Sequence, residues 1–324
     1  MRVLITGDKG FIASNLPRAF QELGHIVVPG ACLKFPHVLA STGEMCVFRN
    51  DERLWEKELR FLGIDVVVHN AAVVGTDVVA LNPEEATLTN VTGTYNICRA
   101  ANNLGIPVLY IGTTVIYDTA KYQDTPIVED SSHAPKTLYG ALKLAGENIV
   151  KSHCKKWAIA RPLFCYGGVG DNNSLISKIF YGSVNNKSKI DMFLDPYKIK
   201  DYMHVNDFCD AIATIVDNGL WGSDWNVSAE TPNAINDIVS MMSSVACKDV
   251  SSIIEWHPGT DYLGNHRLSS EKFRKASGWS PKIDIFTGLL SSWDSINRNV
   301  GTAFNPLQHL ETAKKLGIDL TKYF

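Results

Sequence analysis

The chain has 324 residues, of which 45% are hydrophobic and 20% are charged, and its formal net charge at pH 7 is -3. This length and composition predict a globular protein with one large domain or two closely packed domains. The charge balance offers no basic surface for nucleic acid, and no apolar run approaches the length of a membrane span. Seven scattered cysteines without a C-x-x-C pair indicate reduced thiols in a reducing compartment such as the cytoplasm, and no metal site. A strand-like segment follows Met1 and Arg2 directly, so we expect no signal peptide.

The first predicted strand, Val3-Leu4-Ile5, leads into a glycine-rich turn and then into an apolar-periodic helix. Small residues in such a turn let the backbone approach a pyrophosphate, and the helix N-terminus supplies N–H groups and a positive dipole. Ala13 stands where a third glycine is common, which this motif allows. A plain turn is the alternative interpretation. The pattern predicts a dinucleotide site at Gly7, Gly10, Phe11 and Ile12.

The end of the second predicted strand, 25–28, bears on the choice of dinucleotide. In an NAD-binding unit an acidic residue there binds the ribose 2′-hydroxyl, but the sequence continues Pro-Gly-Ala-Cys-Leu without an acid. Lys9 in the glycine turn and Lys34 beyond the strand are suited to a 2′-phosphate. We therefore expect NADP rather than NAD, with two solvated surface lysines as the alternative.

Further buried strands are predicted at 65–72, 108–111 and 158–160, with helical patterns between them. Alternating strands and helices predict an α/β Rossmann fold, a doubly wound parallel sheet whose ligands bind beyond the carboxyl ends of the strands. The pattern loosens after Gly168, which indicates a smaller interleaved lobe for the substrate. We expect the NAD(P)-binding domain at 1–168 with 203–230 returning to it, and the C-terminal substrate-binding lobe and tail at 169–202 and 231–324.

Tyr139 and Lys143 are four residues apart in a helical pattern, so they lie on one face of the predicted helix. A free phenol, with a pKa near ~10, is a poor acid or base at neutral pH, and a neighbouring cation favours its ionised form. The alternative is an ordinary half-exposed pair. Thr113, at the carboxyl end of the strand 108–111, lies one helix upstream.

Taken in order, these motifs resemble the extended short-chain dehydrogenase/reductase family, specifically its nucleotide-sugar epimerases, dehydratases and reductases. The resemblance covers about residues 1–295. It rests on seven motifs: the glycine turn, His69-Asn70-Ala71-Ala72, Asn90 with Gly93-Thr94, Thr113 with Tyr139 and Lys143, Arg161-Pro162 to Gly167, Lys200 to Asp207, and His266-Arg267 with Gly278 to Pro281. At Lys200 this chain has Lys where the family usually has Arg.

The resemblance implies roles for these residues. Tyr139 transfers a proton to or from the sugar oxygen, Lys143 lowers the pKa of Tyr139 and holds the nicotinamide ribose, and Thr113 hydrogen-bonds the reacting oxygen. Further cofactor contacts are implied for Asn70, Ala71, Ala72, Asn90, Pro162 and Phe164. Contacts with the nucleotide sugar are implied for Thr114, Val115, Asn173, Lys200 and Arg267, the two cations facing its diphosphate. For Lys200, a solvated surface lysine is the alternative interpretation.

Departures from the subfamilies narrow the expected reaction. The 4,6-dehydratases have an Asp-Glu pair after the catalytic threonine, whereas this chain has Thr114-Val115, so dehydration is not expected. The cysteine and histidine that GDP-fucose synthases use for 3,5-epimerisation are replaced by Val115 and Leu175. Asn70, Phe164 and the lysines favour NADPH-dependent reduction of a nucleotide-linked 4-keto-6-deoxy sugar. The segment 200–207 favours the alternative, a C4 epimerase with tightly bound NAD.

Two further expectations concern assembly and catalysis. The helices expected near 83–104 and 138–153 commonly pair two subunits of this family as a four-helix bundle, which implies a homodimer. Outside the enzyme class, a non-catalytic cofactor-sensing protein is the rival interpretation, although such proteins commonly lose the tyrosine or the lysine. The helical pattern near 307–316 lies in a stretch, 301–324, to which the sequence assigns no role.

Overall fold

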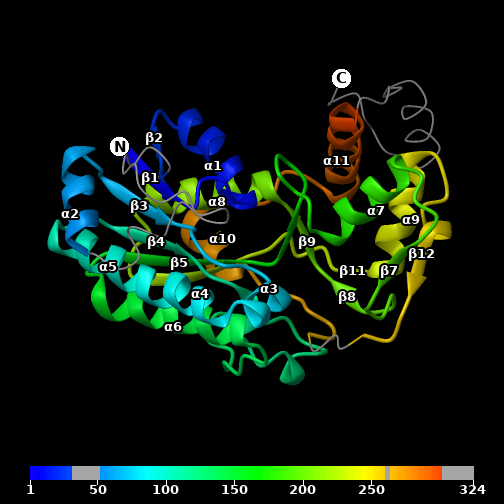
Figure 1. The fold of residues 1–324 in the computed structure, drawn as a ribbon, viewed down its shortest axis with the longest axis horizontal. Helices are drawn as coiled ribbons and strands as arrows, with labels where there is room; N and C mark the ends of the chain where they lie inside the picture. The colour runs from blue at the N-terminus through cyan, green and yellow to red at the C-terminus, as the bar shows by residue number, and fades with distance from the viewer. Residues whose placement is uncertain (31–51, 260–262, 301–324) are drawn as a thin grey trace.

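The computed structural model describes residues 1–30, 52–259 and 263–300. Its largest element is a six-stranded sheet in which every neighbouring pair is parallel, as the sequence predicts (Figure 1). The strand order, β2-β1-β3-β4-β5-β10, runs outward in both directions from the first strand, the arrangement of a doubly wound fold. The strands are β1 (Arg2–Thr6), β2 (Ile26–Pro29), β3 (Val66–His69), β4 (Val108–Ile111), β5 (Trp157–Pro162) and β10 (Ser223–Val227).

Helices cover both faces of this sheet because its strands are apolar on both sides. Val3 and Ile5 of β1 pack on one face against α1 and α8, while Leu4 packs on the other face against α2 and α5. Successive side chains of a strand point to opposite faces, which explains this division. The first face carries α1 (Phe11–Glu22), α8 (Val205–Asp217) and α10 (Glu271–Ser277), and the second carries α2 (Glu52–Phe61), α5 (Thr94–Asn103) and α6 (Leu138–His153).

The connection from β3 to β4 contains several short elements where the sequence indicated one helical stretch. It consists of α3 (Thr76–Leu81), α4 (Pro83–Thr87), a π-helical turn at Leu88–Gly93 and then α5. Within the π-helical turn, the Asn90 amide accepts a hydrogen bond from Val73 N (2.8 Å) and donates one to Val73 O (3.0 Å). Asn90 therefore fixes the chain segment that follows β3.

A smaller part of the molecule lies beside the carboxyl ends of the sheet (Figure 1). Its core is formed by helices that pack around Phe180, Met242 and Trp293. Three short strand pairs accompany them, β6 with β9, β7 with β12 and β8 with β11. The elements are β6 (Phe164–Tyr166), α7 (Leu175–Val184), β7 (Ile190–Met192), β8 (Ile199–Lys200), β9 (Tyr202–His204), β11 (Asn233–Ala234), α9 (Ile235–Ala246), β12 (Ile254–Trp256) and α11 (Ile285–Val300), with a 3₁₀ turn at Ser251–Ile253. Two further 3₁₀ turns, Thr114–Ile116 and Thr119–Lys121, lie in the connection between β4 and α6.

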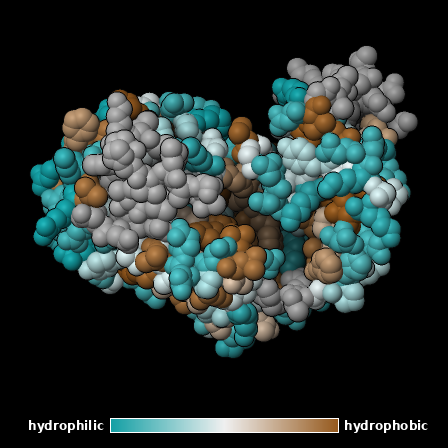
Figure 2. All heavy atoms as spheres, in the orientation of Figure 1, coloured by the Kyte–Doolittle hydropathy of each residue, from teal (hydrophilic) through white to brown (hydrophobic). Residues whose placement is uncertain are grey.

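Between the two parts the surface is hollowed, and apolar side chains gather on the rim that belongs to the larger part (Figure 2). Val74, Val78 and Leu81, which precede or belong to α3, are exposed large hydrophobic residues. Within the described ranges, no helix has both the length and the apolar composition that a bilayer span requires.

Candidate active site

The glycine turn lies at the carboxyl end of β1, directly against the segment that follows β3. Gly7 has a φ of +66°, and a Cβ atom placed on it would lie 2.7 Å from Ala71 Cα. Gly10 N donates to Gly7 O (2.9 Å), and Asn70 Nδ2 lies 3.5 Å from the same oxygen. Helix α1 begins immediately afterwards, so its unpaired N–H groups face this turn. The arrangement has the small residues and the helix N-terminus that a pyrophosphate requires.

The other residues expected at the cofactor take different positions. Lys9 is exposed in the turn, while Phe11 and Ile12 form the half-buried start of α1. Ala72 follows β3 and is also half-buried. Pro162 and Phe164 lie at the end of β5 and the start of β6, both half-buried, and Lys34 lies outside the described residues.

A buried hydrogen-bond chain joins the glycine turn to the helix layer. His69 Nδ1 lies 2.8 Å from Thr6 Oγ1, and His69 Nε2 lies 3.0 Å from Thr94 Oγ1. The Thr94 hydroxyl donates to Asn90 O (2.8 Å), so it can only accept from His69. His69 Nε2 is therefore the donor, and Nδ1 accepts from Thr6, whose oxygen in turn accepts from Ala71 N (3.1 Å). Burial and the nearby Lys143 lower the pKa of His69 to about 3, so the ring stays neutral.

The three residues expected to be catalytic come from the segment that follows β4 and from α6. Thr137 caps α6 by accepting a hydrogen bond from Gly140 N (3.1 Å), which places Tyr139 in the first helical turn. A Cβ atom on Gly140 would lie 2.9 Å from Val115 O, so this turn packs directly on the segment after Thr113. Thr113 itself caps the 3₁₀ turn at Thr114–Ile116.

Lys143 is 3% exposed and reaches back to the end of β4. Its Nζ donates to Ile111 O (2.7 Å) and lies 4.0 Å from the centre of the Tyr110 ring. Burial lowers the pKa of Lys143 to about 7, against the opposing charge of Glu147. Lys143 lies one helical turn after Tyr139 on α6.

The residues expected to contact the substrate are more scattered. Thr114 is buried, Val115 is half-buried, and Asn173 is exposed just before the Ser174 cap of α7. Lys200 is buried, with its Nζ donating to Gly264 O (2.6 Å) and lying 5.5 Å from the centre of the Phe164 ring.

Arg267 is half-buried, and its Nη2 donates to Gln123 O (3.1 Å). The structure thus gives both expected diphosphate-binding cations internal contacts, which the sequence did not anticipate for either. Gln123 also donates to Leu263 O (3.2 Å) and accepts from Asn265 N (2.8 Å). Gln123 donates to Thr119 O (2.6 Å) as well, and no motif singles it out, because all of these partners are backbone atoms.

The two acids of the segment 200–207 have structural contacts. Asp201 accepts hydrogen bonds from the Ser228 hydroxyl, Glu230 N (3.0 Å) and Thr231 N (3.2 Å). Asp207 accepts from Lys282 N and Ile283 N, both at 3.0 Å. Each acid joins a strand or helix near the sheet to a segment far along the chain.

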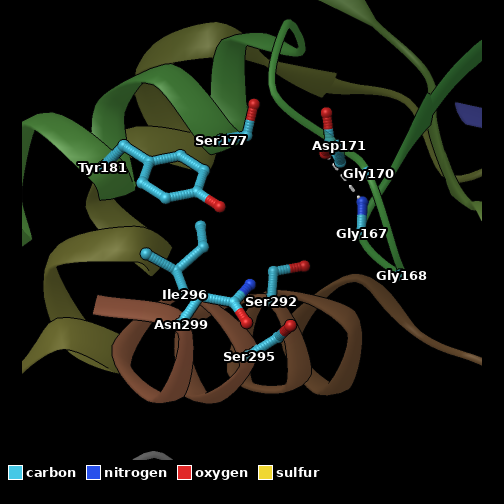
Figure 3. Close-up of a pocket in the computed structure, with 10 residues that line it drawn as sticks. All are labelled: Gly167, Gly168, Gly170, Asp171, Ser177, Tyr181, Ser292, Ser295, Ile296 and Asn299. Atoms are coloured by element: carbon cyan, nitrogen blue, oxygen red, sulfur yellow. Dashed lines mark hydrogen bonds between the residues drawn. The ribbon is translucent and has the colours of Figure 1, made fainter. Parts of the chain in front are cut away.

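A separate small cavity lies between the loop 167–171, α7 and α11 (Figure 3). Its volume of about 20 Å³ is enough for roughly one water molecule. The Tyr181 ring points toward it in Figure 3, and none of Thr113, Tyr139 and Lys143 lines it. We assign it no part in the site.

Two known proteins resemble the chain, one over about half of its length and the other over most of it. It is 32% identical over 172 residues to dTDP-4-dehydrorhamnose reductase from Shigella flexneri, a match that covers 53% of this chain and 54% of that protein. The chain therefore spans about half the length of that relative. It is 25% identical over 334 residues to UDP-glucose 4-epimerase from Corynebacterium glutamicum, which covers 90% of this chain and 95% of that protein.

Solved structures share the fold at lower identity. DesIV, a dTDP-glucose 4,6-dehydratase from Streptomyces venezuelae solved with NAD, has a TM-score of 0.79 at 21% identity, covering 93% of this chain and 98% of that one. RMD from Pseudomonas aeruginosa, solved with NADPH, has a TM-score of 0.75 at 20% identity, covering 92% and 99%. The sequence model of the NAD dependent epimerase/dehydratase family matches residues 3–228, more than half of the chain. The chain belongs to the NAD dependent epimerase/dehydratase family.

Proposed function

We propose that this protein is a 4-ketoreductase that transfers hydride from NADPH to a nucleotide-linked 4-keto-6-deoxy sugar. The observation that carries the proposal is the position of Lys143, which is buried on α6 one helical turn after Tyr139 and whose Nζ bonds Ile111 O, at the end of the strand that leads to Thr113. A tyrosine next to a buried lysine suits proton transfer to a developing alkoxide. The resemblance to dTDP-4-dehydrorhamnose reductase over 53% of the chain supports the same reaction class.

The proposed roles are those that the family resemblance implies for these residues. The turn at Gly7 and Gly10 binds the pyrophosphate, Tyr139 gives its proton to the sugar oxygen, and Thr113 hydrogen-bonds that oxygen. The dinucleotide supplies the hydride when it is bound. Thr114 and Val115 follow Thr113, so this segment has no acid that would eliminate water from the sugar. Lys9, exposed beside Gly10, supports NADPH over NADH because a 2′-phosphate requires a cation.

The second candidate is a nucleotide-sugar C4 epimerase that keeps its NAD bound. The similarity to UDP-glucose 4-epimerase over nearly the whole chain favours it, as does the segment 200–207. The same residues serve both reactions, because an epimerase removes a hydride and returns it to the other face of the sugar. The two candidates differ in whether the cofactor is consumed.

The proposed assembly is a homodimer, and the proposed location is the cytoplasm. Helices α5 and α6 lie side by side on the outer layer of the larger part, where a second copy would complete a four-helix bundle (Figure 1). The five described cysteines are free thiols, which supports a reducing compartment. Light scattering that gives the mass of one chain would contradict the dimer.

The experiment that tests the function supplies NADPH or NADH with a panel of UDP-, GDP-, CDP- and dTDP-linked 4-keto-6-deoxy sugars. We expect stoichiometric oxidation of NADPH with one of them. No net oxidation, together with NAD released when the purified protein is denatured, would favour the epimerase. No turnover and no bound cofactor would favour a non-catalytic role for the same fold.

A further inference from the structure

An ion pair lies buried beneath the candidate catalytic residues. Glu147 follows Lys143 by one turn of α6, and Arg161 belongs to β5. The glutamate is 1% exposed and the arginine is 0% exposed. Arg161 Nε donates to both carboxylate oxygens (3.0 and 3.2 Å), and Nη2 donates to Oε2 (2.8 Å). Removing two charges from water costs about as much as their attraction returns, so stability alone does not account for such a pair.

The pair supports the backbone that leads into Thr113. A Cβ atom on Gly112 would lie 2.5 Å from Glu147 Oε1 and 3.0 Å from Arg161 Cγ, so the chain rests on both side chains there. Lys143 holds the preceding residue through its bond to Ile111 O. The end of β4 is therefore fixed by three side chains, two of which the sequence motifs did not mark as functional.

The guanidinium has two further partners that fix its position. Its Nη1 donates to the Tyr117 hydroxyl (2.6 Å), and its Nη2 also donates to Asp224 Oδ2 (2.6 Å). The Tyr117 hydroxyl in turn donates a hydrogen bond to Asn226 Oδ1 (2.8 Å). Arg161 is thus held by β10 and by the loop after β4, as well as by α6.

The groups around Lys143 differ in charge. His69 on β3 is neutral, Tyr110 on β4 presents its ring, and Tyr139 lies one turn earlier on α6. In the described part of the chain, Glu147 is the negative group that counteracts the effect of burial on Lys143. The Glu147 carboxylate, which is bonded to the cation Arg161 on β5, lies against Gly112, next to the Ile111 carbonyl that the Lys143 ammonium bonds. A negative charge held there favours the ammonium form, the form that can stabilise an ionised phenol.

We propose that Glu147 and Arg161 are positioning residues of the proposed reaction: Glu147 keeps Lys143 charged, and Arg161 holds the Glu147 carboxylate beneath Gly112. Neither residue needs to contact the cofactor or the sugar. Because the pair acts through Lys143 and Thr113, its effect on turnover rests on the proposed function, whereas its effect on Lys143 does not.

The test measures the protonation of Lys143 in the free protein by NMR of ¹³Cε-labelled lysine, with the signal assigned by its loss in K143M. In E147Q, which keeps the shape and removes the charge, we expect the midpoint for Lys143 to fall by about one pH unit or more. E147D keeps the charge, so its Lys143 should titrate with a midpoint close to that of the wild type. D224N removes another acid from the same guanidinium and should leave Lys143 titrating as in the wild type. An unchanged midpoint in folded E147Q would overturn the proposal.

A second variant covers the case in which E147Q does not fold because Arg161 loses its main partner. E147M/R161M removes both charges together, which buried pairs commonly tolerate. We expect this double variant to fold and its Lys143 to titrate with a lower pH midpoint than in the wild type. A midpoint equal to that of the wild type would again reject the proposal.

With a substrate from the panel, E147Q should lose activity on the alkaline side at a lower pH than the wild type, with little change in KM for the sugar. A purely structural pair would lower activity equally at every pH. If no substrate is found, the proposed reaction fails, and the NMR titration still decides whether Glu147 acts on Lys143.

Discussion

The carboxyl end of the parallel sheet and the smaller part of the molecule use polar residues in different ways. At the sheet, hydrogen bonds between the strands already fix the backbone. Buried polar groups such as His69 and Lys143 add further hydrogen bonds between these strands and the neighbouring helices. In the smaller part, β8 and β11 have two residues each, and side chains such as Asp201 and Lys200 hold the loops by bonding backbone atoms. A polar group at the sheet end is therefore available for chemistry, whereas one in the smaller part is largely used to build the fold.

This difference predicts how substitutions should behave. A change at the sheet end should alter catalysis or cofactor binding and leave the free energy of unfolding nearly unchanged, unless it disturbs the backbone itself. A change at a buried charge in the smaller part should alter stability first. Measurements of turnover, cofactor affinity and unfolding on the same variants would separate the two cases.

The largest effect is expected for Tyr139→Phe. Loss of the hydroxyl removes the proposed proton donor and leaves the ring in place, so kcat should fall by about 10²–10⁴-fold. Cofactor affinity and the unfolding midpoint in urea should match the wild type. Tyr95→Phe, on α5, is the matched control and should keep full activity. Near wild-type turnover in Tyr139→Phe would remove Tyr139 from the mechanism.

The next effect is expected for Gly7→Ala, which tests the backbone of the sheet end. At a φ of +66° the new Cβ is strained and also meets Ala71 Cα, so we expect a loss of about 1–3 kcal/mol in unfolding free energy together with weaker dinucleotide binding.

Gly24→Ala separates these two causes. Gly24 has a similar φ of +76°, and nothing lies within 4 Å of the added Cβ. The substitution should therefore lower the free energy of unfolding by about 1 kcal/mol and leave dinucleotide binding unchanged. Unfolding in urea and NADPH fluorescence titration would measure both quantities. Equal dinucleotide affinity in the two variants would mean that the approach of Gly7 to Ala71 does not shape the site.

The same difference explains what could be predicted from the sequence. The parallel sheet follows from short apolar strands that alternate with helices, and the pairing of Tyr139 with Lys143 follows from a four-residue spacing. Both are local patterns, and the structure has the sheet and places the pair in one helix.

The contacts of Lys200, Arg267 and Gln123 could not be predicted in this way. Each depends on a backbone atom that lies 64 to 144 residues away in the sequence, and a backbone atom leaves no mark on residue type. A lysine or arginine that bonds a carbonyl and one that binds a phosphate look alike in a single sequence. The π-helical turn could not be predicted either. Its residue Asn90 bonds the backbone of Val73, which again leaves no mark on residue type.

The last expected effect concerns Asp201 and appears as a dependence of stability on pH. Burial raises the pKa of Asp201 from 3.8 to about 6, although its three hydrogen bonds oppose the change. The folded protein therefore binds this proton more tightly than the unfolded chain does. Stability from this group should rise as the pH falls from about 6 to about 4, by at most about 3 kcal/mol, and should be constant above that window.

Asp201→Asn should remove this slope, since an amide does not titrate and resembles the protonated acid. Other groups also titrate in the window, so the quantity to measure is the difference in unfolding free energy between wild type and variant at each pH. We expect the wild type to gain on the variant as the pH falls from 6 to 4. Asp249→Asn is the control, because hydrogen bonds from Ser251 lower the pKa of this exposed acid and give its effect the opposite sign. A constant difference between wild type and Asp201→Asn would mean that Asp201 stays ionised in the fold, and that its hydrogen bonds outweigh its burial.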